Sequence, residues 1–275
     1  MPKPFITDSI SMLPILTICI PTYNRCSDLK QLLDSIVRHG DHLVASGTIE
    51  VAISDNASSD NTDMMVNEYA ARIPRLTYVR NKSNIGFAGN LNQSIKIGSA
   101  DYCWLMGSDE IILPGALVLI LGKINENSDI ILGNAVTHGK ERHFLKRNGP
   151  SEFFIKSSDD FIKFLEICTE ISSAFAFIST LIVKRQFWDF PLCTEWELLH
   201  PYTHMLRLCR AISAKDTKIL YLDRPLVVTG QNVNEFNSSI LPHFELDLLT
   251  IKYIGECIFH DRQKDVLMEI GRAHV

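Results

Sequence analysis

Short apolar runs alternate with amphipathic segments over the first half of the chain. Ile15–Ile20 is rich in β-branched residues and predicts a strand, and Asp28–Arg38 carries leucine, isoleucine and valine at helical spacing. The same order of strand, loop and helix returns over Ile49–Arg72 and Leu76–Ile97, and a further strand is predicted at Asp101–Met106. Because strands that alternate with helices form right-handed parallel crossovers, the pattern predicts a mostly parallel sheet with helices on both faces.

The pattern continues less regularly in the second half. Leu113–Ile124 and Asp129–Asn134 predict one more helix and strand, and the polar, basic stretch His138–Asn148 predicts a loop or a short hairpin. Beyond it we expect, in chain order, a helix capped by Asp159 or Asp160 and running to Ile167, a strand at Ala176–Val183, a helix at Glu197–Ile212, strands at Lys218–Leu222 and Leu226–Val228, and a helix at Phe244–Phe259. The predicted fold class is therefore α/β, with a helical region towards the C-terminus.

The composition predicts a globular chain without a disulfide framework. Of 275 residues, 46% are hydrophobic and 21% are charged, and a net charge of -5 provides no overall basic field, so we expect no nucleic-acid partner. Seven cysteines, with no CxxC pair, favour a reducing cytoplasm. Met1–Leu13 does not resemble a signal peptide, and the longest apolar runs are too short to cross a bilayer, so we expect a soluble or peripheral protein.

Polar side chains follow each of the first three predicted strands, in the segments Pro21–Arg25, Asp55–Asp60 and Asn81–Asn90. Because the carboxyl ends of parallel strands meet at the edge where α/β sheets bind ligands, we expect these segments to lie together. Asp55 can accept a hydrogen bond from a base, and Gly86 lets a ligand approach the backbone closely. Such groups suit a nucleotide. The alternative is that they form only turns and caps.

A fourth strand runs directly into two adjacent carboxylates, in the sequence Trp104–Glu110. Asp109 and Glu110 would thereby reach the same edge of the sheet, where hard oxygen ligands suit Mg²⁺ or Mn²⁺ holding a diphosphate. The alternative is a solvated turn in which Ser108 or Asp109 caps a helix that Pro114 helps to start. For Glu110 itself we favour a helix-start charge over a supporting role beside the metal.

The order and spacing of these motifs resemble those of family 2 glycosyltransferases with the GT-A fold, which carry P-x-Y-N-R, D-N-A-S-x-D, N-x-G and D-x-D-like segments. The resemblance covers about Leu16–Leu113 and implies a nucleotide-diphosphate-sugar donor. This chain has Gly107 where many relatives have the first Asp of D-x-D, so Asp109 is the one predicted side-chain ligand of Mg²⁺ or Mn²⁺. The residues assigned to the donor site are Pro21, Tyr23, Asn24, Arg25, Asp55, Asn84, Gly86, Asn90 and Ser108.

Two blocks in the second half, Ser179–Asp189 and His200–His204, resemble the abequosyltransferase-type members of that family, which act on lipid-linked O-antigen units. The resemblance implies a glycan or polyprenyl-diphosphate-linked acceptor. It also implies a cytoplasmic protein, with possible peripheral contact at the inner membrane. CDP- or dTDP-linked deoxysugars become plausible donors beside UDP-sugars. Residues 1–134 would form the donor half, and residues 135–268 the acceptor half, of one GT-A domain.

Transfer with inversion, which the resemblance implies, needs a base for the acceptor hydroxyl. The candidates are Glu195, Glu197, His200 and His204, and we choose His204 as the catalytic base because its block matches the subfamily. The alternative is a packed helix histidine bonded to a backbone carbonyl. Two other functions stay open: a non-catalytic nucleotide-sugar or glycan-binding module, and a sugar nucleotidyltransferase, for which the usual glycine-rich phosphate loop is missing.

The last seven residues, Glu269–Val275, can be encoded by a nucleotide string that resembles a sequencing-library adapter. The alternative is an ordinary frayed terminus in which Gly271 ends a helix. We expect a non-native tail, and a natural protein that continues past Met268 with a basic or amphipathic membrane-facing segment.

Overall fold

The computed structural model describes residues 13–146, 149–169, 173–230 and 249–258, and the structural statements below concern these residues. The elements, in chain order, are β1 (Leu16–Thr22), α1 (Cys26–Ala45), β2 (Ile49–Asp55), α2 (Thr62–Asn67), β3 (Leu76–Arg80), α3 (Gly86–Lys96), β4 (Tyr102–Leu105), β5 (Ile111–Ile112), α4 (Ala116–Ile124), β6 (Ile130–Thr137), β7 (Lys140–Arg142), β8 (Glu152–Ile155), α5 (Ser158–Glu166), α6 (Ser173–Ala176), η1 (Ile178–Thr180), β9 (Leu181–Lys184), α7 (Arg185–Trp188), α8 (Glu195–Leu199), α9 (Thr203–Ala214), β10 (Thr217–Val228) and η3 (Ile254–Ile258). The predicted tail Glu269–Val275 lies outside the described residues, as do residues 244–248 and 259 of the predicted helix Phe244–Phe259, whereas residues 249–258 of that helix are described and are helical.

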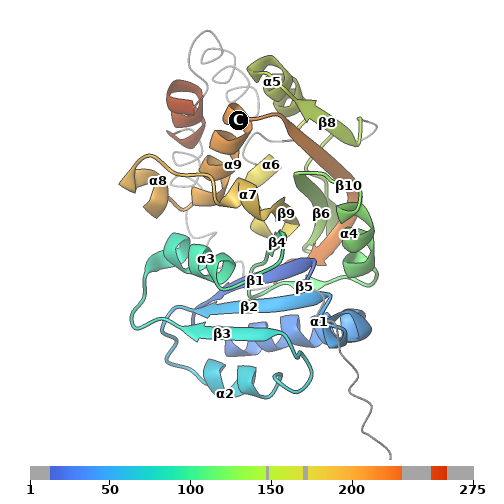
Figure 1. Cartoon of the computed structure of the whole chain (residues 1–275), viewed down its shortest axis with the longest axis vertical. Coiled ribbons are helices and arrows are strands. Elements are labelled where there is room, and N and C mark those ends of the chain that lie inside the picture. Colours follow the sequence, from blue (N-terminus) through green and yellow to red (C-terminus); the bar gives the residue numbers. More distant parts are fainter. Residues whose placement is uncertain (1–12, 147–148, 170–172, 231–248, 259–275) are drawn as a thin grey trace, which may run out of the picture.

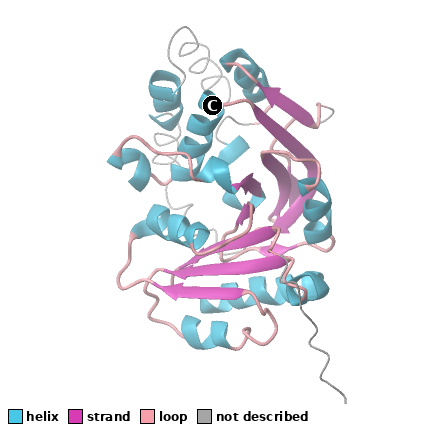
Figure 2. Cartoon of the chain, viewed as in Figure 1, coloured by secondary structure: helices cyan, strands magenta, loops and turns pink. Residues whose placement is uncertain are grey.

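One sheet of ten strands runs through the described part of the chain, in the order β3-β2-β1-β4-β9-β6-β10-β5, with β7 beside β6 and β8 beside β10. The strands β3, β2, β1 and β4 are parallel neighbours. β9 is antiparallel to both β4 and β6, whereas β10 runs parallel to β6. The mostly parallel α/β sheet predicted from the sequence is therefore confirmed (Figure 2).

Both faces of the sheet are buried, because alternate residues of the central strand β1 enter different apolar clusters. Ile18 and Ile20 pack in a cluster with residues of α1 and α4, whereas Cys19 packs in a second cluster with residues of α3, α5 and α9. Figure 1 shows α5, α7 and α9 gathered around β9 and β10, at the end of the molecule opposite α2 and β3. None of the helices in the described ranges combines the length and the apolar content needed to cross a bilayer.

The two predicted halves share this single sheet, because β6 crosses their boundary between residues 134 and 135. The hairpin predicted within His138–Asn148 is confirmed: β6 and β7 are antiparallel and are joined at His138 and Gly139, which have φ of 50° and 75°. Positive φ at both central residues is the geometry of a type I′ turn, whose twist matches that of the flanking strands.

Pro201 divides the helix predicted over Glu197–Ile212. α8 ends at Leu199, His200 is extended with φ of -63° and ψ of 138°, and α9 begins at Thr203. Proline lacks the N–H that a helix needs and forces the residue before it into an extended conformation. The prediction of one continuous helix is therefore wrong.

Several other predicted elements are also corrected. The apolar run Ala176–Val183 is strand only from Leu181, because helix α6 and a 3₁₀ turn come first; a short buried apolar run fits either conformation. The two predicted strands between residues 218 and 228 form the single strand β10, whose pairing with β6 shifts around Pro225. α2 ends at Asn67 rather than near residue 72, and Ser157 rather than Asp159 or Asp160 caps α5.

Candidate functional site

Four parallel strands end at one edge of the sheet. Thr22 at the end of β1 pairs with Asp55 at the end of β2, and Asp55 pairs with Arg80 at the end of β3. β4 ends at Leu105, opposite Cys19 of β1. The polar loops that we expected to meet therefore do lie at the same edge, where α/β proteins bind ligands.

Asp55 ties the loop after β2 to β3, and its side chain is only 1% exposed. Its Oδ1 accepts hydrogen bonds from the backbone N–H of Ser58 at 2.9 Å and from the Ser58 hydroxyl. Its Oδ2 accepts from the Tyr78 hydroxyl at 2.6 Å and lies 3.7 Å from Nε of Arg80. Burial, together with the bond to Asp55, raises the pKa of Tyr78, so that hydroxyl remains a donor. Both oxygens of Asp55 thus already serve protein donors.

The loops after β1 and β2 are fastened to each other through Asn24, which has a positive φ of 51°. Its backbone N–H donates to Oγ of Ser58 at 2.9 Å, and its Oδ1 accepts from the backbone N–H of Ser59 at 2.7 Å. Tyr23, next to it, is 45% exposed, whereas Pro21 is buried within β1. The loop therefore presents Tyr23 and Asn24 at the surface and keeps Pro21 in the sheet.

Asn56 joins this region to the loop before α3, although the sequence analysis did not single it out. Its Nδ2 donates to Oδ1 of Asn84 at 2.7 Å, and its Oδ1 accepts from the backbone N–H of Ile85 at 2.8 Å. Gly86 has a φ of 75°, and a Cβ built on it would meet no described atom within 4 Å. The signal for Asn56 was its place directly after Asp55 in the D-N-A-S motif.

Asn90, on α3, is buried and holds three segments together. Its Oδ1 accepts from the Ser54 hydroxyl at 2.7 Å and from Nδ2 of Asn81 at 3.0 Å, and its Nδ2 donates to the carbonyl of Thr22 at 3.1 Å. The structure therefore places Asn90 under the strand-end loops. Such a position allows it to shape the site without touching a ligand.

At the end of β4, Asp109 forms an ion pair with Arg25 from the loop after β1. Their side chains are 24% and 28% exposed, so both reach the surface of the edge. Ser108, between the strand and this pair, is buried. Neither Ser108 nor Asp109 caps a helix, because β5 intervenes and the residue that precedes α4 is Gly115.

Glu110 is not a helix-start charge, because it is buried with 5% of its surface exposed. Its Oε1 accepts from the Ser179 hydroxyl at 2.9 Å, and that hydroxyl accepts from the backbone N–H of Gly107 at 3.1 Å. Burial and then the charge of Asp109 raise the pKa of Glu110 to about 8, against smaller lowering effects of Ser179, Gly230 and Arg25. Its Oε2 finds no hydrogen-bond partner in the described part of the chain.

The carboxylate loop fits a small hard cation. Oxygens of Asp109 and Glu110 each lie 3.1 Å from the position of a Cβ built on Gly107, so the two carboxylates converge there. An unpartnered buried carboxylate oxygen beside a second carboxylate is a donor set that Mg²⁺ or Mn²⁺ accepts. No group of three or more His, Cys, Asp or Glu side chains that could hold a metal ion occurs in the described ranges, this loop included, so diphosphate and water would have to supply the other ligands.

The structure does not support our choice of His204 as the catalytic base. The residue is 1% exposed, and its Nε2 lies 3.0 Å from the carbonyl of Ala176, as expected for a packed helix histidine. Burial lowers the pKa of His204 to about 4, and the neighbouring His200 adds to this effect. A base that accepts a proton from an incoming hydroxyl needs access to it, which His204 lacks.

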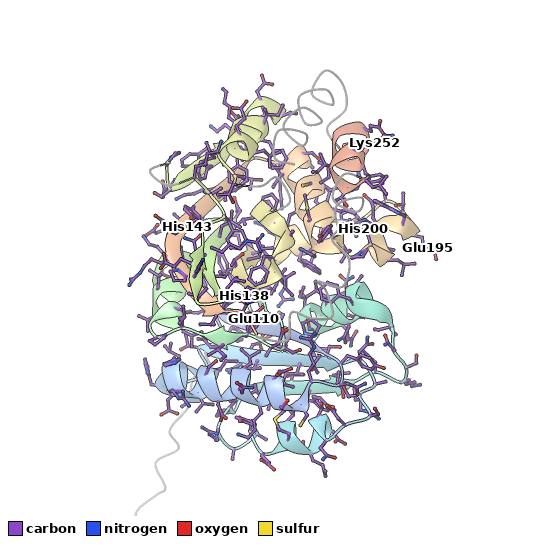
Figure 3. The ribbon with its side chains drawn as sticks, turned by 180° about the vertical axis from the view of Figure 1, so that it is seen from behind. Glu110, His138, His143, Glu195, His200 and Lys252 are labelled. Carbon is purple, nitrogen blue, oxygen red and sulfur yellow. The ribbon has the colours of Figure 1, made fainter. Side chains whose placement is uncertain are left out.

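The other candidates for the base differ in exposure. Glu197 is buried, forms a capping box with Thr194 and pairs with Arg210, which identifies it as a structural residue. His200 is also buried, and its Nδ1 accepts from the backbone N–H of Tyr202 at 3.0 Å. Glu195 is exposed at the start of α8; Figure 3 shows it near His200 and apart from Glu110.

A mostly parallel sheet with polar loops at the carboxyl ends of its strands is typical of α/β proteins that bind nucleotides at that edge. Residues 17–184 match the sequence model of Glycosyl transferase family 2, and the chain belongs to this family. Membership favours a glycosyltransferase over a sugar nucleotidyltransferase.

Curated relatives are similar over different lengths. The chain is 28% identical over 232 residues to the abequosyltransferase RfbV of Salmonella typhimurium. The aligned region covers 81% of this chain and 68% of the relative. It is also 28% identical over 125 residues to the GalNAc(5)-diNAcBac-PP-undecaprenol beta-1,3-glucosyltransferase of Campylobacter jejuni. This second aligned region covers 45% of this chain and 39% of the relative.

Solved structures show the same fold. TarS of S. aureus, in complex with UDP-GlcNAc, is similar with a TM-score of 0.67 at 18% identity, over 94% of this chain and 72% of that chain. The mannosyltransferase PcManGT of Pyrobaculum calidifontis, in complex with GDP-Man and Mn2+, is similar with a TM-score of 0.52 at 15% identity, over 96% and 74%. The GT-A glycosyltransferase fold implied by the sequence resemblance is thereby confirmed.

Proposed function

We propose that the chain transfers a sugar from a nucleotide-diphosphate donor to a glycan or lipid-linked oligosaccharide acceptor, in the synthesis of an O-antigen-type cell-surface polysaccharide. Family membership supports the transfer reaction, and the name of the Campylobacter jejuni relative supports a lipid-linked acceptor. The UDP-GlcNAc bound by TarS and the GDP-Man bound by PcManGT support a nucleotide-diphosphate-sugar donor. The observation that carries the proposal is the network that joins three strand-end loops beside the Arg25–Asp109 ion pair.

The proposed donor-site residues divide by exposure. Those at the surface of the edge would contact the nucleotide directly: Tyr23, Asn24, Arg25, Asn84 and Gly86. The buried ones would hold the loops in place: Pro21, Asp55, Asn90 and Ser108. Tyr23 offers an aromatic face, and the open space at Gly86 allows a ligand to approach the backbone.

Charge stabilisation would come from the Arg25–Asp109 pair. As the bond from the anomeric carbon to the donor breaks, negative charge grows on the leaving diphosphate. The guanidinium of Arg25, oriented by Asp109, can donate to phosphate oxygens. Asp109 is the residue that would hold Mg²⁺ or Mn²⁺, and such an ion, when bound, neutralises part of the diphosphate charge.

The base would come from the acceptor half, and Glu195 replaces His204 as our proposal because its carboxylate is exposed. Glu195→Gln should abolish transfer to the acceptor while donor binding is retained, and His204→Gln serves as the buried control. Transfer that survives in Glu195→Gln but fails in a folded His204→Gln variant would reverse this assignment.

We also propose a cytoplasmic location with peripheral contact at the inner membrane, where a polyprenyl-diphosphate-linked acceptor lies. The support is the set of large apolar side chains exposed on α8, which are Trp196, Leu198 and Leu199. Exposed apolar residues clustered on one short helix are typical of an interaction surface.

A thermal-shift screen of CDP-, dTDP- and UDP-sugars tests the proposal, because a ligand that binds only the folded state raises its stability. We expect at least one nucleotide sugar to stabilise the protein and to be consumed when a polyprenyl-diphosphate-linked glycan is added. The absence of a carboxylate at Gly107 favours one alternative, a non-catalytic module. Stabilisation by a nucleotide sugar without hydrolysis or transfer would support that alternative.

A further inference from the structure

The carboxylate loop contains a second acidic side chain that its surroundings leave incompletely satisfied. Glu110 is buried, its Oε1 accepts from the Ser179 hydroxyl, and its Oε2 makes no hydrogen bond among the described residues, although the backbone N–H of Gly230 lies near enough to the carboxyl to lower its pKa. A buried carboxylate oxygen without a donor is costly, and native structures rarely keep one without a reason. The position of Glu110 therefore needs a partner that the protein side chains do not supply.

The two carboxylates approach one point at Gly107, through Oδ1 of Asp109 and through Oε1, not Oε2, of Glu110. An ideal Cβ at Gly107 would be 3.1 Å from Oδ1 of Asp109, 3.1 Å from Oε1 of Glu110 and 3.3 Å from Cγ of Glu110. The absence of a side chain at residue 107 thus leaves the two carboxylates facing one small space. A carboxylate at residue 107 would crowd Glu110 in its present conformation. The side chain of Glu110 thus lies close to where a side chain at residue 107 would otherwise begin.

We propose that Glu110 is the second carboxylate of a divalent-cation site with Asp109, in place of the carboxylate that Gly107 lacks. The inference rests on the proposed function only in that a donor diphosphate would supply further ligands. Ser179 is then a positioning residue, since its hydroxyl fixes Oε1 and is itself fixed by the backbone N–H of Gly107. Metal ligands are commonly oriented by such hydrogen bonds.

Arg25 competes with the cation for Asp109. Its guanidinium pairs with Oδ2 of Asp109, so it neutralises this carboxylate in the absence of a metal ion. Binding of a divalent cation between Asp109 and Glu110 weakens this pair, because two cations at one carboxylate repel each other. Arg25 is then available to a phosphate oxygen of the donor.

Binding of Mn²⁺ to the purified full chain tests the proposal without any activity measurement. Free Mn²⁺ is followed by electron paramagnetic resonance while the protein is titrated. We expect Glu110→Gln to weaken Mn²⁺ binding by more than tenfold and Ser179→Ala to weaken it by about tenfold. Glu126→Gln is the matched control, since Glu126 is exposed, pairs with Lys123 and should bind Mn²⁺ as the wild type does.

The fold of each variant is checked by thermal unfolding without metal. The amide introduced by Glu110→Gln is neutral and can still accept from Ser179, so we expect the midpoint of this variant to equal or exceed that of the wild type. Arg25→Gln removes the competing cation and should tighten Mn²⁺ binding several-fold. Unchanged or weaker binding in Arg25→Gln would contradict the competition.

Wild-type Mn²⁺ affinity in a folded Glu110→Gln variant would overturn the proposed site. The proposed function is tested separately. Sugar transfer that continues in EDTA, by a protein that binds no Mn²⁺, would contradict the cation site but would support the transferase activity. Conversely, Mn²⁺ binding that depends on Glu110, in a protein that binds no nucleotide sugar, would retain the site and contradict the proposed function.

Discussion

Buried polar residues hold the loops of the candidate donor site in place. Asp55 and Asn90 are almost fully buried, and their hydrogen bonds reach across the ends of β1, β2 and β3. Removing one partner from such a network leaves another buried group unsatisfied, which costs about 1–3 kcal/mol. These residues would therefore influence donor binding indirectly, through the loops that they hold in place.

Asp55→Asn is expected to lower the free energy of unfolding by about 1–3 kcal/mol, because the amide nitrogen cannot accept from Ser58 or Tyr78. The loosened loop should raise KM for the donor more than it lowers kcat, since its contacts are similar in the ground and transition states. Denaturant titration and donor kinetics measure both effects. Unchanged stability together with an unchanged KM would remove Asp55 from this role.

Motif order was sufficient to predict Asn24, Arg25, Asp55 and Asp109 at one edge, because parallel strands place their carboxyl ends together. It was not sufficient for Glu110, whose burial depends on Ser179 from a distant part of the chain. The sequence pattern around Glu110 is that of an ordinary turn. Its role could therefore be inferred only from the tertiary packing.

At the scale of elements, Pro201 divides one predicted helix into α8 and α9. Pro201 follows the end of α8 and gives α9 a separate N-terminus at Tyr202, which has no side-chain cap, whereas α8 begins with a capping box of Thr194 and Glu197. The proline rule could have predicted this break, whereas helical periodicity alone predicted one helix. The same periodicity places His204 and Leu208 on one helical face, which was an unused signal that His204 is buried.

Glu197→Ala should lower the free energy of unfolding by about 1–3 kcal/mol, because it removes a buried carboxylate and leaves the partly exposed guanidinium of Arg210 without its ion-pair partner. Thr194→Ala removes only the cap hydrogen bond and should cost about 1 kcal/mol. Urea denaturation of the two variants gives the comparison. If Glu197→Ala is as stable as the wild type but inactive, Glu197 has a catalytic rather than a structural role.

For the whole molecule, buried neutral histidines make stability depend on pH. The pKa of His204 falls from 6.5 to about 4 in the folded state, so the unfolded chain binds the proton first as the pH decreases. His204 therefore contributes no penalty above pH 6.5, and stability falls progressively from about pH 6.5 to about pH 4. The gap between the two pKa values corresponds to about 3 kcal/mol.

Denaturation midpoints of the wild type and His204→Gln across this pH range measure the effect. Protonation of carboxylates such as Glu50, whose pKa is lowered in the folded state, also lowers the stability of the protein in acid, but this loss is the same in both proteins. The variant should therefore show a flatter pH dependence. Parallel curves for the two proteins would show that His204 stays solvated or protonated in the folded state.

Asp109, in the loop after β4, is the residue at which the strand-end network would contact the leaving diphosphate. The decisive measurement is sugar transfer by the wild type and Asp109→Asn from the nucleotide sugar that stabilises the wild type most strongly. We predict that the variant keeps the wild-type unfolding midpoint within a few degrees and loses about 10² to 10³ in kcat, as expected for removal of one charge-stabilising contact. A folded Asp109→Asn variant that turns over at the wild-type rate would contradict the proposed site.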